Sequence, residues 1–165
     1  MKQAGITDAI RPCIAAAKAL AAETNAPAVC VELQDGALIG GKTSELMEPL
    51  SAAILNALKK LAGIDPKRHL IARSAIEPIQ RMKTDYLRSE TARLRCGEIL
   101  IALAISASED AYAAKALELV PALRNCEAHC SVIVPDADAS VYKRLGMHLT
   151  ESPRYQSSSL YHNNN

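Results

Sequence analysis

A hairpin pattern between residues 27 and 39 constrains the fold of this chain more than any other feature. Apolar and polar residues alternate from Val29 to Leu33, Asp35-Gly36 follows, and the chain becomes apolar again at Leu38. Asp-Gly between two such runs is a strong short-range signal for a β-hairpin. A two-residue turn at this point predicts that Leu33 lies opposite Leu38.

The same stretch matches the phosphate-loop pattern G-x-x-x-x-G-K-[ST] from Gly36 to Thr43. In a true phosphate loop the backbone between the glycines is free of strand pairing, so that its N–H groups point at phosphates. Here Ala37-Leu38-Ile39 is apolar and typical of a strand. Pro49 also predicts that the next helix begins several residues after Thr43. We therefore interpret the motif as a hairpin followed by a corner.

Periodicity and turn residues predict the remaining elements. Helices are expected at residues 10–25, 48–62, 74–87, 98–107, 111–123 and 137–145, and further strands at 69–72, 126–134 and 148–150. This order predicts an α/β fold, a three-layer αβα sandwich in which helices cover both faces of a mixed sheet. We expect one domain over residues 1–152 and a polar C-terminal tail over residues 153–165.

Composition narrows the classes of protein that fit. The chain has 49% hydrophobic residues but neither Phe nor Trp, so its core must be built from aliphatic side chains. A net charge of +1 argues against a nucleic-acid partner. No apolar run reaches the roughly 18 residues that cross a bilayer, and no signal-peptide pattern is present, so no membrane partner is expected. Five cysteines, an odd number, indicate buried, reduced thiols and a cytoplasmic location.

Five segments resemble a bacterial uncharacterised family, domain of unknown function eighteen-forty-six. The resemblance extends from Met1 to about His162 and corresponds to roughly the last third of a typical member. It implies that Met1 is an internal methionine and that the chain is a detached C-terminal domain. The missing N-terminal domains are then its expected partners. A homo-oligomer is a further expectation. The segments are Val31-Glu32-Leu33-Gln34-Asp35-Gly36, Gly41-Lys42-Thr43-Ser44-Glu45-Leu46, Ala75-Ile76-Glu77-Pro78-Ile79-Gln80, Glu98-Ile99-Leu100-Ile101-Ala102-Leu103 and Cys126-Glu127-Ala128-His129.

The resemblance implies a cytidine-deaminase-like fold, although the zinc motif of deaminases is absent. Those enzymes need a His/Cys-x-Glu pair and a Pro-Cys-x-x-Cys pair, and the chain has neither. On one strand, Cys126 and Cys130 would lie about 13 Å apart with His129 on the other face, so the three cannot share an ion. Arg95 also stands where the family pattern resembles a histidine. We expect no metal and no cofactor.

The remaining candidates for ligand binding come from three places in the chain. In a three-layer sheet such groups can converge on one cleft. Each also has an ordinary structural role: a solvated lysine, a helix cap at residue 43 or 44, a first-turn carboxylate at residue 77 and a hydrogen-bonded histidine. The candidates are Lys42, Thr43 and Ser44 at the corner, Glu77 near the start of a helix, and Glu127 with His129 on one strand face.

Two functions fit these observations. The first is a non-catalytic C-terminal module that supports assembly or interdomain packing of a larger protein. The second is an accessory half of an enzyme or ligand site that binds an anionic or nucleotide-like small molecule, and it predicts a cleft containing both Lys42 and His129. The sequence leaves open whether the protein is an enzyme, and activity of the isolated chain is the less expected outcome.

Overall fold

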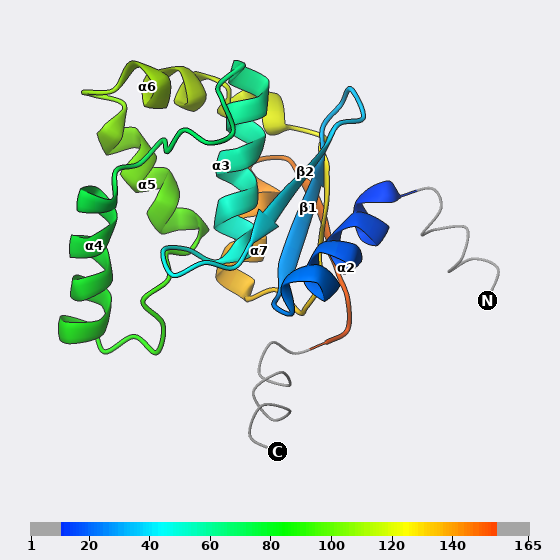
Figure 1. Ribbon diagram of the computed structural model, residues 1–165, viewed down its shortest axis with the longest axis horizontal. Coiled ribbons are helices and arrows are strands. Elements are labelled where there is room, and N and C mark those ends of the chain that lie inside the picture. The colour runs from blue at the N-terminus through cyan, green and yellow to red at the C-terminus, as the bar shows by residue number, and fades with distance from the viewer. Residues whose placement is uncertain (1–10, 155–165) are drawn as a thin grey trace.

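A computed structural model of the chain describes residues 11–154, which form a four-stranded mixed sheet with six α-helices (Figure 1). The strand order is β2-β1-β3-β4. β1 is antiparallel to both β2 and β3, and β3 is parallel to β4. The strands span Ala28–Glu32 (β1), Leu38–Lys42 (β2), Glu127–Cys130 (β3) and His148–Glu151 (β4).

Helices cover both faces of this sheet, as the sequence predicts. Cys30 of β1 packs on α2, whereas Val29 and Val31 point the other way, into the large core that α3 helps to form. α5 and α6 pack on α3, farther from the sheet, and Figure 1 shows α4 beyond α5. The helices span Pro12–Thr24 (α2), Pro49–Ala62 (α3), Arg73–Arg81 (α4), Cys96–Ser106 (α5), Ala111–Glu118 (α6) and Asp136–Arg144 (α7). Short π and 3₁₀ segments follow at Met82–Tyr86 (η1) and Val120–Leu123 (η2).

The hairpin between β1 and β2 is confirmed, but its register is not the predicted one. Glu32 lies opposite Leu38, and the N–H of Leu33 donates to the carbonyl of Ala37 at 2.9 Å. The loop therefore has three residues, with Gly36 in a left-handed conformation at φ 92°. A type I turn followed by a left-handed glycine is a common alternative to the two-residue turn. The predicted pairing of Leu33 with Leu38 is wrong.

The phosphate-loop pattern is a hairpin and a corner, as interpreted. Both Gly40 and Gly41 belong to β2, and α3 begins only at Pro49. A Cβ atom on Gly41 would come within 2.4 Å of the Pro49 carbonyl oxygen and 2.5 Å of the Ala53 nitrogen. Gly41 is required because α3 lies directly against the backbone of β2.

Two strand predictions need correction. Residues 69–72 form an irregular loop, and its two central residues, Leu70 and Ile71, are both buried rather than alternating. The ammonium of Lys59 donates to the carbonyls of Pro66 and Arg68 at 2.8 and 3.2 Å, which holds the turn just before this loop to α3. The strand expected over 126–134 ends at Cys130, because the next residues turn toward α7.

Parts of other predictions lie outside the described residues. These are the beginning of the first expected helix at residue 10 and the polar tail beyond Arg154. Between residues 11 and 154, no helix has the length and apolar character that a membrane crossing requires.

Candidate functional site

The corner after β2 is held together by its own hydrogen bonds. Lys42 is exposed at the end of β2. The hydroxyl of Thr43 donates to the Pro27 carbonyl at 2.7 Å, and the hydroxyl of Ser44 accepts from the N–H groups of residues 46 and 47. Neither side chain caps α3, whose N-cap residue is Glu48. The expected capping role at residue 43 or 44 is therefore wrong.

The two candidate glutamates each have a cationic partner. Glu77 is the fifth residue of α4, too far along the helix to be a first-turn carboxylate, and it lies 3.7 Å from Arg73 on an exposed surface. Glu127 of β3 lies 3.0 Å from the guanidinium of Arg11, at the start of α2. Both carboxylates have the contacts of ordinary structural ion pairs.

His129 is buried on the α2 side of β3. It lies opposite Cys30 in the sheet, whereas Cys130 points into the core on the other side. Its Nδ1 lies 2.8 Å from the hydroxyl of Thr150 and its Nε2 lies 2.9 Å from the hydroxyl of Ser152. These contacts make His129 a link between β3 and the end of β4.

The structure does not bring the predicted candidates into one cleft. Figure 1 places α4, which carries Glu77, at the opposite end of the molecule from α2 and Glu127. Two of the cavities among residues 11–154 are lined by neither Lys42 nor His129. A role for these residues in ligand binding stays a prediction.

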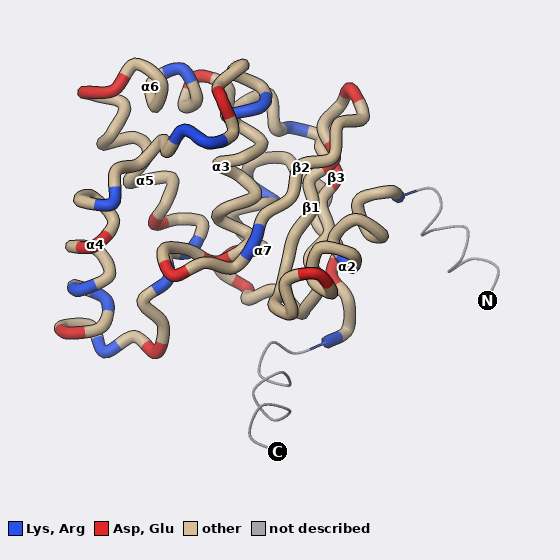
Figure 2. Tube along the Cα trace, in the orientation of Figure 1, with Lys and Arg blue, Asp and Glu red and all other residues tan. Residues whose placement is uncertain are grey.

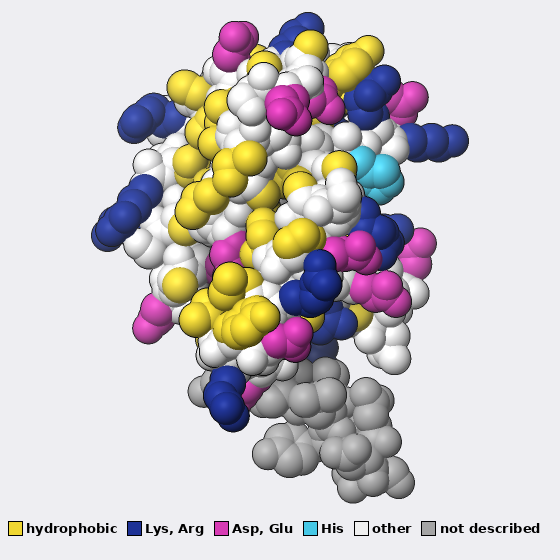
Figure 3. Space-filling view, turned by 90° about the vertical axis from the view of Figure 1, so that its left-hand side faces the viewer, with side chains coloured by type: hydrophobic (Ala, Val, Ile, Leu, Met, Phe, Trp, Pro, Cys, Tyr) yellow, Lys and Arg dark blue, Asp and Glu magenta, His cyan; other side chains and the backbone are white. Residues whose placement is uncertain are grey.

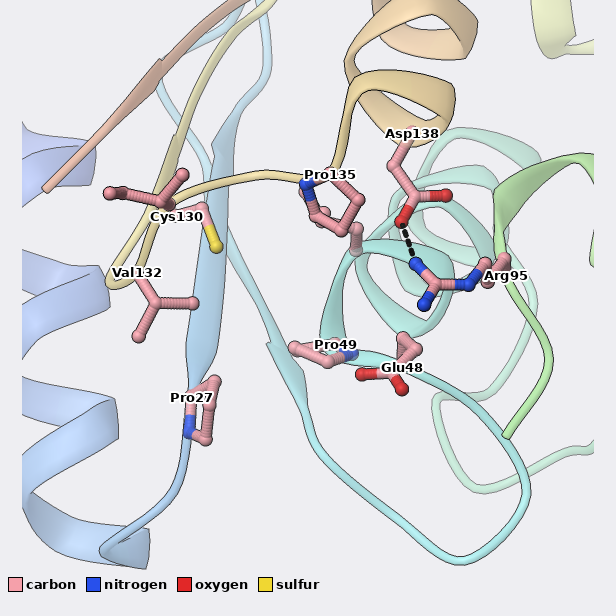
Figure 4. Close-up of a pocket in the computed structure, with 10 residues that line it drawn as sticks. Pro27, Glu48, Pro49, Arg95, Cys130, Val132, Pro135 and Asp138 are labelled. Atoms are coloured by element: carbon pink, nitrogen blue, oxygen red, sulfur yellow. Dashed lines mark hydrogen bonds and ion pairs between the residues drawn. The ribbon is translucent and has the colours of Figure 1, made fainter. Parts of the chain in front are cut away.

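One of those cavities lies beyond the end of β3, where the first residues of α3, α5 and α7 meet. Glu48 precedes α3, Arg95 precedes α5, and Asp138 lies in the first turn of α7. All three line the cavity, together with Cys130 and apolar side chains (Figure 4). Its volume is about 20 Å³, enough for one water-sized group. The crevice outside the carboxyl ends of strands is the usual place for ligands in α/β sheets.

The charged side chains that line this cavity differ in how many hydrogen-bond and ion-pair partners they have. Asp138 is 2% exposed, lies 3.4 Å from the guanidinium of Arg95 and accepts from the N–H of Cys96 at 3.2 Å. Glu48 is 8% exposed, and its Oε1 accepts from the hydroxyl of Thr91 at 3.5 Å, the outer limit of a hydrogen bond. Figure 4 shows the Glu48 carboxylate below the Arg95 guanidinium, with the dashed line running only from Arg95 to Asp138.

The thiols near the cavity are unsuited to nucleophilic attack. Burial raises the pKa of Cys130 to about 11. Burial, and then the nearby charge of Asp138, raises the pKa of Cys96 well above its usual value. Both are therefore thiols at pH 7, and the thiolate is the reactive form. Within the part of the chain that the structure describes, no three His, Cys, Asp or Glu side chains gather as metal ligands.

The sequence pointed only indirectly to this cavity. Arg95 stood out as a departure from the family pattern, but its partner Asp138 lies 43 residues away in the chain. Glu48 and Asp138 were not singled out because an acidic residue just before a helix or in its first turn is an ordinary helix signal. A local signal did exist, since Glu48-Pro49 and Pro135-Asp136 both mark helix starts.

Comparison with known proteins identifies the family. Residues 9–161 match the family described as "Domain of unknown function DUF1846, C-terminal". The chain belongs to this family. It is 42% identical over 162 residues to a UPF0371 protein of Corynebacterium aurimucosum, covering 98% of the chain and 32% of that protein. It is 44% identical over 161 residues to UPF0371 proteins of Streptococcus thermophilus and Streptococcus pneumoniae serotype 19F, covering 98% of the chain and 33% of each.

The chain thus spans about a third of the length of these relatives. The family description places the matched region at the C-terminal end of its members. The expected family and the expected C-terminal placement are both confirmed. Neither the family description nor the relatives' names give an activity.

Proposed function

We propose that this chain is a non-catalytic interdomain module, and that α5 packs against the N-terminal region of a full-length family protein. The observation that carries the proposal is an exposed apolar surface on α5. We call it the α5 strip, and it consists of Gly97, Ile101, Ala104 and Ile105. Ile101 and Ile105 are 64% and 66% exposed.

α5 has the composition of a helix that is covered on all sides. Glu98 is its one charged residue among eleven, and Figure 2 shows the helix almost entirely tan. Its other face, which includes Ile99 and Leu103, is fully buried in the core. Helices that are apolar all round normally lie inside a protein, and interface centres are depleted of charge. The strip is therefore a surface that lacks its partner.

The segment η1 extends this apolar surface. Met82, Tyr86 and Leu87 are each at least half exposed, and the ammonium of Lys83 holds η1 to the first turn of α5 through Glu98 at 2.8 Å. Figure 3 shows hydrophobic side chains gathered in a band down the face that carries α4, α5 and α6. Large exposed apolar patches on single domains mark interaction sites.

The N-terminal region of the relatives is the occupant that fits best. It makes up about two thirds of their length, so a polypeptide twice as long as this chain accompanies the domain in each relative. Such a region is tethered to the domain, so it meets the α5 strip at high effective concentration and needs no high intrinsic affinity.

Cysteine accessibility tests this proposal, because all five native cysteines are buried. The variant Ile101→Cys is prepared in the chain alone and in a chimera that carries the chain in place of the C-terminal third of the Streptococcus thermophilus relative. We expect Ellman's reagent to label Cys at position 101 readily in the chain and about tenfold or more slowly in the chimera. Urea-unfolded samples of both proteins give the unprotected rate.

Two outcomes contradict the proposal. Equal labelling rates in the chain and a cooperatively folded chimera show that the N-terminal region does not cover the strip. Protection in the chain alone that increases with its concentration shows that a second copy is the occupant. Ala22→Cys, at an exposed position on α2, is the matched control for the chemistry of labelling.

We also propose a cytidine-deaminase-like arrangement and a reducing, cytoplasmic setting. The first is supported by the order of the elements, in which α2 precedes the β1–β2 hairpin, α3 to α6 follow it, and β3, α7 and β4 complete a sheet with order β2-β1-β3-β4. The second is supported by five buried free thiols. The second is tested by lysing cells in acid, which traps the redox state of the thiols, and then labelling the free cysteines of the protein. Cysteines found in disulfides would contradict it.

A further inference from the structure

The outer edge of β2 presents backbone groups that no other strand of residues 11–154 pairs with. β2 is the last strand of the sheet, with β1 on one side only. The N–H of Leu33 bonds the carbonyl of Ala37. Because bonded and non-bonded pairs alternate along an antiparallel ladder, the backbone groups of residues 38 and 40 point away from β1. Such an edge is a template for a further strand.

One of these outward groups already has a partner. The side-chain amide of Asn56, on α3, donates to the carbonyl of Gly40 at 2.9 Å. The N–H of Gly40 and both backbone groups of Leu38 have no hydrogen bond to another described residue. They leave two donors and one acceptor at the edge, and an extended chain laid beside β2 offers the complementary groups.

A groove of about 570 Å³ lies against this edge, and we call it the β2 groove. Its other wall is the C-terminal half of α3 with residues 63–66, and Figure 1 shows α3 running beside β2. The volume falls in the range of about 300–1,000 Å³ that is usual for ligand sites. A bound strand also has apolar surface to contact, because the lining includes Leu38, Ile39, Ile64 and Pro66.

Lys59 brings a buried positive charge to the β2 groove. It is 9% exposed, and no carboxylate of residues 11–154 lies within 4.0 Å of its nitrogen. Two of its three N–H donors bond the carbonyls of Pro66 and Arg68. Burial lowers its pKa, and Asp65 opposes this only from a longer distance. A buried charge without a counter-charge costs free energy, so Lys59 lacks an anionic partner.

The charges of the lining favour an acidic occupant. Lys59 and Lys60 give two positive charges, and Asp65 gives one negative charge. Basic residues in the last turn of a helix interact favourably with its dipole, which accounts for the exposed Lys60. That role does not require the burial of Lys59. One carboxylate would balance the lining and accept the remaining hydrogen bond of Lys59.

We propose that the β2 groove binds an extended, acidic peptide segment of a partner protein. The segment pairs with the edge of β2 as a fifth strand and places a carboxylate against Lys59 and Lys60. In recognition of this kind, main-chain hydrogen bonds give affinity and side-chain contacts give specificity. The site is separate from the α5 strip, since none of the residues of that strip lines the groove.

Other occupants fit the β2 groove less well. A second copy of the chain could pair through its own β2, but that strand has no acidic side chain and ends in Lys42. It would leave the charge of Lys59 unbalanced. A small free carboxylate balances that charge but leaves the backbone groups of Leu38 and Gly40 without partners.

Titration with short peptides tests the proposal on the 165-residue chain. The probes are capped pentapeptides of alternating Val and Thr, with one Glu moved through the five positions because the register is not fixed. The amide NMR signals of residues 38 and 40 are followed. We expect a saturable shift with at least one Glu peptide, and binding about tenfold weaker when Gln replaces its Glu.

A backbone control tests the added strand. N-methylation of alternate residues removes the N–H groups that would bond β2, and we expect it to weaken binding of the best Glu peptide about tenfold or more. Absence of a saturable shift with all five Glu peptides would overturn the proposal. Equal binding of a peptide methylated in either of the two alternating patterns would overturn it as well.

Substitution of Lys60 tests the position of the carboxylate. Lys60 is exposed, so Lys60→Gln removes the charge with little effect on packing. We expect the best Glu peptide to bind this variant about tenfold more weakly and its Gln counterpart to bind as before. Lys115→Gln, at an exposed position on α6, is the matched control. Unchanged affinity of Lys60→Gln for the Glu peptide contradicts the placement of the carboxylate.

Two further measurements distinguish the other occupants. Sodium acetate that shifts the same signals and matches the affinity of the Glu peptide shows a site for small carboxylates, and this result overturns the proposal. Signals of residues 38 and 40 that change on dilution, together with a dimer in sedimentation velocity, show that a second copy pairs with β2 and overturn it too. We expect neither result.

Discussion

Gly41 is the residue at which the packing of this fold leaves least room. Gly41→Ala would place a methyl group 2.4 to 2.7 Å from backbone and side-chain atoms of Pro49 and Ala53. We expect a loss of about 2–4 kcal/mol in the free energy of unfolding, because α3 must move away from β2. Urea denaturation followed by circular dichroism measures it. Gly97→Ala, where nothing lies within 4 Å, is the control and should change stability by no more than about 1 kcal/mol, in the stabilising direction. Equal stability of the two variants would contradict this account.

At the same scale, the sequence predicted the roles of single residues better than the contacts between residues that are distant in the chain. Hydrogen bonding by the His129 side chain was among the expected structural roles, and the structure confirms it with contacts to Thr150 and Ser152. The link between Arg95 and Asp138 was not foreseen. Pairs far apart in the chain meet only through tertiary packing, and no local periodicity reports them.

The connection between η1 and α5 depends on a single carboxylate. Glu98 accepts from the N–H of Arg95 at the start of α5 and from the ammonium of Lys83, which is 6% exposed. We expect Glu98→Ala to cost about 2 kcal/mol, because it removes a helix cap and leaves a buried lysine without its counter-charge. Thermal unfolding measures the loss. Glu77→Ala removes an exposed ion-paired glutamate, and we expect it to cost no more than about 0.5 kcal/mol. Similar losses in both variants would show that Glu98 has no special role.

Helices were predicted from the sequence more accurately than strand lengths and turns. The helix expected over 48–62 is observed at Pro49–Ala62, because a proline starts it and a left-handed Gly63 ends it. The strand expected over 69–72 is an irregular loop, and Lys59 binds the carbonyls of Pro66 and Arg68 just before it. Apolar runs of four residues fit either structure, so only the surrounding contacts decide between them.

For the whole molecule, the family and its C-terminal placement followed from sequence, whereas the surfaces that remain open did not. The apolar run Ile99-Leu100-Ile101 indicated a helix, yet it could not show that Ile101 would face outward without cover. The exposure of Ile101 depends on which elements pack around α5. The region that covers α5 in our proposal is the N-terminal region of the longer relatives, which lies outside this sequence. The proposal on α5 therefore rests on the structure.

Buried thiols should make the stability of the whole chain fall at high pH. Burial raises the pKa of Cys30 and that of Cys130 from 9.0 to about 11. Between about pH 9 and 11 the unfolded chain loses these protons while the folded chain keeps them, so stability decreases as pH rises, by up to about 3 kcal/mol for each thiol. Burial lowers the pKa of Lys59, which has the opposite effect below its ordinary pKa of 10.5.

Comparison of the native chain with Cys130→Ala isolates the thiol, because Lys59 is the same in both. Urea unfolding under reducing conditions at pH 8, 9, 10 and 11 gives the free energy of unfolding of each protein. The substitution costs roughly 1–2 kcal/mol at pH 8 through lost packing. Because it also removes the thiol that resists ionisation, the difference should shrink as pH rises and can change sign by pH 11. A difference that stays constant across this range would show that Cys130 ionises alike in the folded and unfolded chains.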